Sequence, residues 1–319
     1  MSHIYVFSPS SAIRDRKAFQ RGIRHLRSLG HEVEVDAAAL AHHMRFAGED
    51  QVRLEAVSRA ACSGADIALI SRGGYGLTRI LGGLPYRVLD KAVSKGLKLV
   101  GLSDFTAMQT AMLAKTGTPS WAGPSLIEDF GAEEGVDEIA QACFDDVICG
   151  QAEGTGWRLP AKSVAALAKS VKGDVQEGVM LANRATLWGG NLSVLCSLLG
   201  TPWFPQVKGG VLFIEDVNEH PYRVERSLSQ LHMAGVLKQQ KAILFGSFTG
   251  FKPVAGYDRG FGLDSVMDRV RREAKVPVLA GLPFGHVRTK VMLPVGRKVD
   301  LVVQGREALM FWEHDHHSH

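Results

Sequence analysis

The sequence predicts an α/β protein whose strands form a parallel sheet. Short apolar runs alternate with segments of helical period along most of the chain, which is the pattern of βαβ units. The chain has 319 residues, so it can form two domains or one large one. Its composition, 45% hydrophobic and 22% charged, is that of a globular protein.

The first half contains five predicted strands with helices between them. Pro9 ends the first strand, and Gly30 ends the first helix. We expect one domain over residues 1–150. The predicted strands are 4–8, 31–35, 67–70, 98–102 and 120–122, and the predicted helices are 14–29, 49–62, segments up to about 95, 104–113 and 133–147.

The second half begins after a poorly patterned segment, 151–173, which we interpret as an interdomain connection. We expect residues 174–319 to form the second domain. Its predicted elements are a β-like run at 175–185, a turn entering a helix at 187–195, strands at 211–216, 242–248 and 277–282, helices at 221–234 and 263–274, and β-like runs at 290–293, 298–303 and 308–312.

Composition gives no sign of a nucleic acid or a membrane as partner. The net charge is only +4, and no Lys/Arg run stands out. The N-terminus leads directly into a strand pattern without a basic segment and a long apolar one, so we expect no signal peptide. No stretch approaches the ~18 apolar residues that cross a bilayer. We therefore expect a cytoplasmic protein.

Cysteine usage points to the same compartment. None of the four cysteines forms a CxxC pair, and we expect buried free thiols in a reducing environment. They are Cys62, Cys143, Cys149 and Cys196. The His-rich residues 314–319 could hold a metal weakly, but we expect them to form a disordered tail.

Ser103 lies where an apolar run changes to a helical pattern. Such a change predicts a buried strand, a sharp turn and a helix, with Ser103 at the carboxyl end of the strand. The N–H groups of the following helix point at this position, so Ser103 could be a nucleophile beside oxyanion donors. Alternatively, Ser103 only caps the helix. The run around it lacks the last glycine of GxSxG, so the α/β-hydrolase elbow is not indicated.

Two further side chains follow predicted strands. Glu215 comes after the apolar run 211–214 and could orient a histidine. Alternatively, Glu215 or Asp216 caps the helix that begins near Pro221 or pairs with Arg223 or Arg226. His286 follows a strand and Gly285, which places it to reach into a cleft, although it could be an exposed loop residue. The other histidines that could act as the base are His25, His42, His43, His220 and His232.

The glycine turn at residues 72–76 could present backbone N–H groups to an anion. It does not match GxxxxGKS or GxGxxG, so nucleotide binding is not indicated, and it could be only a tight connection. Metal catalysis is the main rival interpretation, but no HExxH or similar spacing is present. We expect neither a metal nor another cofactor.

Five blocks in the same order along nearly the whole chain resemble one family, the LD-carboxypeptidases, which are murein tetrapeptide carboxypeptidases. The blocks are SRGGYG at 71–76, GLSDFT at 101–106, WGGNL at 188–192, IEDVNEHPYRVER at 214–226 and GLPFGH at 281–286. The resemblance implies a flavodoxin-like N-terminal domain, a smaller β-rich C-terminal domain and an active site in the cleft between them.

The resemblance also implies the chemistry. It implies a serine protease triad of Ser103, Glu215 and His286, with an oxyanion hole formed by the backbone N–H groups of Gly74 and Asp104. Family members are cytoplasmic homodimers that need no metal. They are hydrolases that remove the terminal D-alanine from L-Ala-γ-D-Glu-meso-diaminopimelate-D-Ala in peptidoglycan (cell-wall) recycling, so the implied partner is a muropeptide substrate.

The acidic groups of such a substrate call for cations. Arg72, Arg223 and Arg288 are the candidates, although each could equally form a surface ion pair. Two other functions remain open. One is cleavage of peptide-nucleotide conjugates, as in the related microcin C immunity proteins. The other is solute binding by a two-domain protein, which the missing export signal and the Ser, Glu and His set disfavour.

Overall fold

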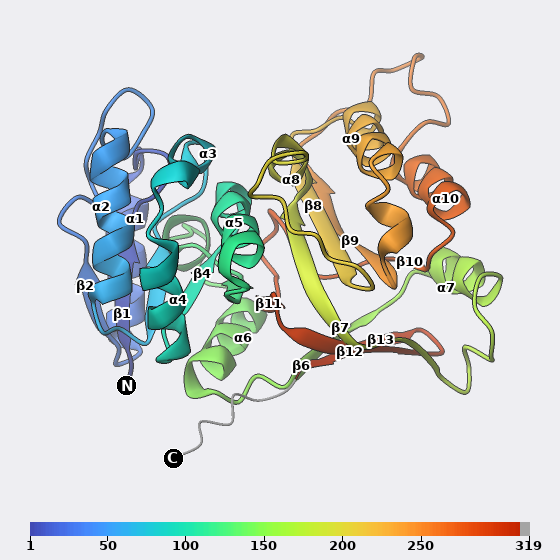
Figure 1. Ribbon diagram of the computed structural model, residues 1–319, viewed down its shortest axis with the longest axis horizontal. Coiled ribbons are helices and arrows are strands. Elements are labelled where there is room, and N and C mark those ends of the chain that lie inside the picture. The colour runs from blue at the N-terminus through green and yellow to red at the C-terminus, as the bar shows by residue number, and fades with distance from the viewer. Residues whose placement is uncertain (313–319) are drawn as a thin grey trace. The chain divides into compact units, whose positions relative to one another are not determined.

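The computed structural model describes residues 1–312, which divide into two compact units. The first unit comprises Met1–Ala152, Gly200–Pro205 and Arg288–Gly296. The second comprises Glu153–Leu199, Gln206–Val287 and the described chain from residue 297 onward. Each unit has its own sheet (Figure 1). The expected His-rich tail at 314–319 lies outside the described residues.

The first unit is built on a sheet with the strand order β11-β5-β4-β3-β1-β2. Strands β1 to β5 run parallel, and β11 pairs antiparallel with β5 at the edge. The order 2-1-3-4-5 is that of flavodoxin-like folds, so this part of the prediction is confirmed. The strands are β1 (His3–Phe7), β2 (Glu32–Val35), β3 (Ile67–Ile70), β4 (Lys98–Gly101), β5 (Ser120–Ala122) and β11 (Leu293–Val295).

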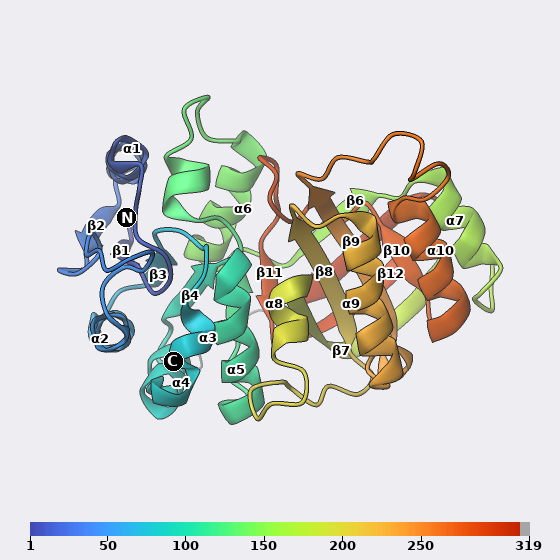
Figure 2. The ribbon, with the colours of Figure 1, turned by 90° about the horizontal axis from the view of Figure 1, so that it is seen from above.

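Helices cover both faces of this sheet. Figure 2 shows α1 and α6 on one face and α2 to α5 on the other. Every residue of β3 is buried, as expected of a strand covered on both faces. The helices are α1 (Arg16–Ser28), α2 (Asp50–Cys62), α3 (Leu77–Ile80), α4 (Tyr86–Ser94), α5 (Thr106–Thr116) and α6 (Glu138–Cys149), with short turns η1 (Leu81–Gly83), η2 (Ser103–Phe105) and η3 (Leu126–Phe130).

The second unit has a sheet with the strand order β10-β9-β8-β7-β12-β13-β6. The long strand β7 joins its two parts, because residues 179–186 pair antiparallel with β12 whereas residues 187–191 pair parallel with β8. The strands are β6 (Gly154–Arg158), β7 (Val179–Asn191), β8 (Val211–Val217), β9 (Ala242–Thr249), β10 (Val278–Ala280), β12 (Lys298–Gln304) and β13 (Glu307–Trp312).

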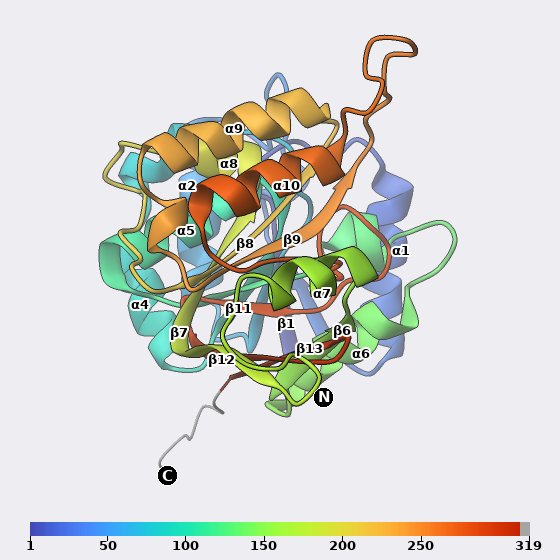
Figure 3. The ribbon, with the colours of Figure 1, turned by 90° about the vertical axis from the view of Figure 1, so that its right-hand side faces the viewer.

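Helices α8, α9 and α10 pack along the parallel part of this sheet (Figure 3). Each of these helices connects two neighbouring parallel strands. The carboxyl ends of β7, β8, β9 and β10 therefore lie at the same edge of the sheet. The helices are α7 (Ala161–Ala168), α8 (Leu192–Ser197), α9 (Pro221–Met233) and α10 (Leu263–Ala274), with the short turn η4 (Leu237–Gln239).

Three segments differ from the sequence-based expectations. Residues 151–173, expected as a connection, contain β6 and α7. The expected turn at 187–191 is the end of β7, where glycines continue a strand because neighbouring β8 supplies a full parallel ladder. The strand expected at 290–293 is instead β11, and it belongs to the sheet of the first unit. Its partner lies far away in sequence, so local pattern alone does not locate it.

The cysteines also differ in part. All four are free, as expected, and Cys196 is buried. Cys62 and Cys149 are exposed, however, because each is the last residue of a helix, where the chain leaves the core. Within residues 1–312, no helix combines the length and the hydropathy that a bilayer crossing requires.

Candidate active site

Ser103 lies directly after β4 in the first unit and begins the turn η2. Its φ of 65° is left-handed, a conformation that is uncommon for a residue with a side chain and is characteristic of sharp functional turns. The capping alternative is not supported, because the N-cap residues of η2 and α5 are Leu102 and Phe105. Ser103 therefore sits at the carboxyl end of a parallel strand without a capping role.

The glycine turn lies against Ser103. A Cβ added at Gly73 would fall 2.7 Å from Ser103 Cβ, so the two segments touch and only glycine fits there. Gly74 has a φ of 109°, and a Cβ on it would lie 2.3 Å from Ser11 Oγ. The first unit thus brings together Ser103 and the glycine turn, as the sequence predicts.

The side chain of Asp104 has contacts that sequence reasoning missed. Its carboxylate is buried and accepts hydrogen bonds from Ser10 Oγ at 2.8 Å and from the Leu77 N–H at 2.9 Å. Burial raises the pKa of this carboxyl group, while these two donors act in the opposite direction. The backbone N–H of Asp104 is the group predicted for the oxyanion hole. Its side chain instead bonds to Ser10 and to the backbone of Leu77.

Glu215 and His286 meet in the second unit. Glu215 lies in β8 and is fully buried, and its Oε2 is 2.8 Å from Nδ1 of His286. An ionised carboxylate only accepts hydrogen bonds, so this contact requires the proton on Nδ1 and leaves Nε2 as the basic nitrogen. The side chain of His286 is 22% exposed. Gly285 is needed beside it, because a Cβ there would lie 3.1 Å from Glu215 Oε2 at a φ of 131°.

Asn191 and Asp216 complete this cluster. From the sequence, Asp216 is a candidate only for a helix cap or an ion-pair partner, and Asn191 has no assigned role. Asn191 Nδ2 donates to Glu215 Oε1 at 3.1 Å and to Asp216 Oδ1 at 2.9 Å, while its Oδ1 accepts from the Val194 N–H. Asp216 Oδ2 accepts from the N–H and the hydroxyl of Ser193. Burial raises the pKa of Asp216, opposed by these donors. The usable signal was position: Asn191 ends a strand parallel to the one that carries Glu215.

Glu215 does not cap α9, and two of the competing histidines, His25 and His220, have other partners. The N-cap of α9 is His220, whose Nδ1 accepts from the Tyr222 N–H at 3.4 Å while its Nε2 lies 2.9 Å from Asp258. His25 is paired with Gln141. Neither of these two histidines is bonded to Glu215, whereas His286 is.

The three candidate arginines lie in different surroundings. Arg72 is partly buried and sits next to the glycine turn, with Nη2 3.9 Å from the position of a Cβ on Gly74 and 4.0 Å from Glu128. Arg223 is exposed and lies near Glu219. Arg288 is exposed and donates to the carbonyls of residues 134 and 135. Only Arg72 adjoins one of the predicted oxyanion donors within its own unit.

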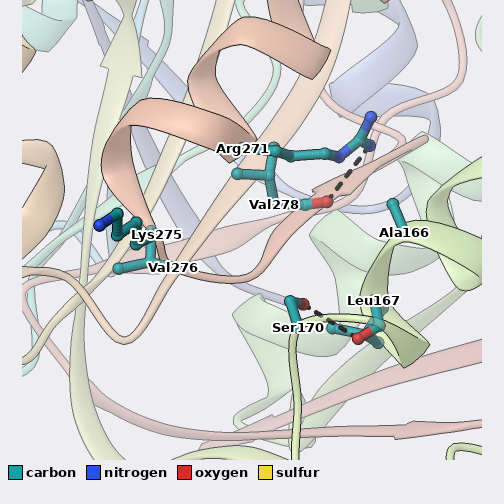
Figure 4. A pocket seen from close by; sticks show the side chains of 7 residues that line it. All are labelled: Ala166, Leu167, Ser170, Arg271, Lys275, Val276 and Val278. Atoms are coloured by element: carbon teal, nitrogen blue, oxygen red, sulfur yellow. Dashed lines mark hydrogen bonds between the residues drawn. The ribbon is translucent and has the colours of Figure 1, made fainter.

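The second unit also contains a cavity of about 280 Å³ between α7, α10 and β10 (Figure 4). The Arg271 guanidinium beside it is held by Asp268, Ser163 and the Val278 carbonyl. No predicted site residue lines this cavity. Across residues 1–312, no three His, Cys, Asp or Glu side chains cluster in a way that could hold a metal ion.

Comparison with known proteins identifies the same family twice. Residues 4–123 match the LD-carboxypeptidase N-terminal domain, and residues 184–301 match its C-terminal domain. A putative carboxypeptidase of Synechocystis is 31% identical over 303 residues, which cover 93% of this chain and 90% of that protein. A probable murein peptide carboxypeptidase of Bacillus subtilis is 29% identical over 306 residues, covering 96% and 90%.

The fold agrees with solved structures. The crystal structure of muramoyltetrapeptide carboxypeptidase from Oxalobacter formigenes has a TM-score of 0.83 and 35% identity, covering 98% of this chain and 99% of that one. The microcin C7 self-immunity protein of Escherichia coli is also similar, with 27% identity over 229 residues that cover 68% of this chain and 66% of that protein. Both domain matches and the full-length similarity lead to one conclusion: the chain belongs to the LD-carboxypeptidase family.

Proposed function

We propose that this protein is a serine carboxypeptidase that hydrolyses the L,D bond between meso-diaminopimelate and the terminal D-alanine of murein tetrapeptides. The hydrogen bond from His286 to the buried Glu215 carries the proposal, because it leaves Nε2 of His286 as a base. Family membership and relatives named as murein peptide and muramoyltetrapeptide carboxypeptidases support the substrate.

In this mechanism the two units supply different parts of one triad. Nε2 of His286 takes the proton of Ser103 while Glu215 holds the ring and stabilises the imidazolium. Ser103 Oγ attacks the diaminopimelate carbonyl. His286 then gives its proton to the leaving amine, D-alanine departs, and water hydrolyses the acyl-enzyme. The strained φ of Ser103 supports its role as the nucleophile.

The oxyanion would lie between the N–H groups of Gly74 and Asp104. Each such donor stabilises the transition state by about 3–4 kcal/mol in enzymes where one has been removed. Arg72 is our preferred partner for the terminal carboxylate of the substrate, because it adjoins Gly74. Arg223 and Arg288 are then the remaining candidates for the other acidic groups.

A second candidate function is the cleavage of peptide-nucleotide conjugates. The similarity to the microcin C7 self-immunity protein supports it, with 27% identity over 68% of this chain. The muramoyltetrapeptide carboxypeptidase structure is 35% identical over 98% of this chain, whereas structures of the immunity protein that cover the same share are only 22–24% identical. We therefore place it second.

A substrate panel separates the two functions. Purified protein is incubated with the free tetrapeptide, its sugar- and nucleotide-linked forms, and aspartyl sulfamoyl adenosine, and products are identified by mass spectrometry. We expect release of D-alanine from the tetrapeptides, with no change in EDTA. Cleavage of aspartyl sulfamoyl adenosine, without release of D-alanine from the tetrapeptides, would favour the second function. Strong inhibition by EDTA, with activity restored by zinc, would contradict the triad.

Compartment and assembly belong to the same proposal. Four free thiols support a reducing environment, so we propose that the enzyme acts in the cytoplasm. The family resemblance supports a homodimer, which light scattering of the purified protein tests directly. A monomer at micromolar concentration would contradict it.

A further inference from the structure

The connection between β1 and α1 carries three buried serines that reach the loops around Ser103. Ser8 Oγ lies 2.6 Å from Ser71 Oγ, at the start of the glycine turn. Ser10 Oγ donates to the Asp104 carboxylate at 2.8 Å. Ser11 Oγ accepts from the Tyr75 N–H at 3.0 Å. One connection therefore contacts both segments that carry the proposed oxyanion donors.

The Asp104 carboxylate is the centre of these contacts. It is 2% exposed, and its Oδ2 accepts from both Ser10 and the Leu77 N–H, which directly follows the glycine turn. Arg53, fully buried, joins the same segments through hydrogen bonds from Nη1 to the carbonyls of Pro9 and Gly76. The β1–α1 connection, the glycine turn and the Ser103 turn are thus held together by buried hydrogen bonds.

The Ser103 turn needs such support because Ser103, a residue with a side chain, has a positive φ. Gly74 adopts its positive φ without strain, but a Cβ on it would fall within the Ser11 hydroxyl, so the glycine turn is closely packed against the β1–α1 connection. A strained conformation like that of Ser103 persists only where the surroundings determine it. An N–H group that moves by about 1 Å loses its catalytic alignment, at a cost on the order of 10²-fold in rate.

We propose that the Asp104 side chain, oriented by Ser10, is a positioning residue: its carboxylate holds the glycine turn against the Ser103 turn and so keeps the two oxyanion donors aimed. This inference rests on the proposed serine mechanism. It assigns the side chain of Asp104 a role separate from that of its backbone N–H. Because oxyanion donors act when charge develops, misplacing them lowers kcat and leaves KM nearly unchanged.

Ser10→Ala is the mildest test. It removes one donor to Asp104 and leaves the Leu77 N–H in place, so we expect kcat to fall about fivefold with KM unchanged. Thr118→Val is the matched control, because the buried Thr118 hydroxyl donates to the Asp90 carboxylate at 2.7 Å in the same unit. The control also removes a hydroxyl that bonds to a carboxylate, together with its contact to Thr116 Oγ1, and it should keep the wild-type kcat.

Two Asp104 variants extend the series. Asp104→Ala removes the carboxylate, and we expect kcat to fall about 10²-fold. Asp104→Asn keeps the shape and one acceptor oxygen, so its kcat should lie between those of Asp104→Ala and Ser10→Ala. This partial rescue is what a positioning role requires. If Asp104→Ala does not fold, the other two variants still carry the test.

Each folded variant is measured in two ways. D-alanine release gives kcat and KM, and mass spectrometry gives the rate at which a fluorophosphonate modifies Ser103, a reaction that uses the same oxyanion donors. Parallel losses in both rates, in the stated order, support the proposal. Wild-type rates in Ser10→Ala and Asp104→Asn would overturn it. Failure of the wild type to react at Ser103 would instead overturn the proposed serine mechanism.

Discussion

The two units hold their candidate catalytic groups in different ways. The first unit relies on its main chain, with positive φ at Ser103 and Gly74 and with buried serines bonded to the neighbouring loops. The second relies on side chains, because Glu215 is fixed by His286 and Asn191 inside a cluster of buried carboxylates. We therefore expect the Ser103 region, the first half of the proposed site, to be sensitive to backbone geometry, and the Glu215–His286 region, its second half, to be sensitive to charge.

The strongest test asks whether the two halves form one site. Ser103→Ala and His286→Ala should each lower kcat for D-alanine release by about 10⁴- to 10⁶-fold, because members of a triad act as a unit. The double variant should be no worse than either single variant. Circular dichroism and substrate binding check that each protein remains folded.

Additive losses would contradict a shared site. A His286→Ala protein that keeps most of its rate would remove His286 from the mechanism and leave the two halves independent. Either result would mean that Ser103 in the first unit and the Glu215–His286 pair in the second do not act together.

The charge of the second half is tested by Glu215→Gln. The neutral amide cannot stabilise the imidazolium of His286 and can present an N–H to Nδ1, so we expect kcat to fall about 10²- to 10⁴-fold. Glu225→Gln is the matched control, because Glu225 on α9 forms an ion pair with Arg269 on α10, and the same change there should lower kcat less than twofold. Equal losses of kcat in the two variants would contradict the proposal that the charge of Glu215 stabilises the imidazolium of His286.

The alternation of apolar runs and helical segments predicts that the strands of the first sheet are parallel and that Ser103, Glu215 and His286 lie near the carboxyl ends of strands. These features depend on local pattern and on the rule that parallel strands present ligands at their carboxyl ends. The flavodoxin-like arrangement was implied only by the family resemblance. The edge strand β11 could not be predicted in the same way, because its partner β5 is distant in sequence.

The supporting residues were missed for a related reason. Ser10 reads as an ordinary loop serine after Pro9, and the importance of its hydroxyl depends on Asp104, which is 94 residues away. Asn191 is the N-cap of α8, and its amide nitrogen also bridges the carboxylates of Glu215 and Asp216, to which nothing in the local sequence points. Long-range hydrogen bonds of this kind leave no periodic signal in a sequence.

Substrate binding by the first half gives the next largest effect. Arg72→Met should raise KM for the tetrapeptide about 10- to 100-fold with a smaller change in kcat, since a charge-assisted hydrogen bond to a carboxylate contributes about 1.5–3 kcal/mol. Arg223→Met and Arg288→Met provide the comparison under the same steady-state assay. A larger rise in KM for Arg223→Met or Arg288→Met would indicate that this arginine, and not Arg72, binds the terminal carboxylate of the substrate.

The smallest effect on activity is expected from Asp36→Asn, which separates the stability of the first unit from the geometry of its site. The buried Asp36 carboxylate accepts from Tyr5 Oη at 2.6 Å and from Arg59 Nε at 2.7 Å. Burial alone would raise the pKa of Asp36, but these hydrogen bonds outweigh it and hold the pKa below its usual value. The ionised group therefore stabilises the fold above about pH 4, and this contribution is lost as the pH falls through the folded pKa.

Asp36→Asn should lower the free energy of unfolding by about 2 kcal/mol at pH 7, with the difference shrinking below about pH 4, as urea titrations would measure. Asp66→Asn, at an exposed carboxylate bonded to the His3 N–H, should change stability by less than about 0.5 kcal/mol across that range. Because Asp36 does not contact the loops around Ser103, kcat at 25 °C should stay at the wild-type value. A kcat that falls together with stability would mean that the geometry around Ser103 depends on the stability of the whole first unit. An unchanged kcat would indicate that the local contacts of Asp104 and Ser10 determine this geometry.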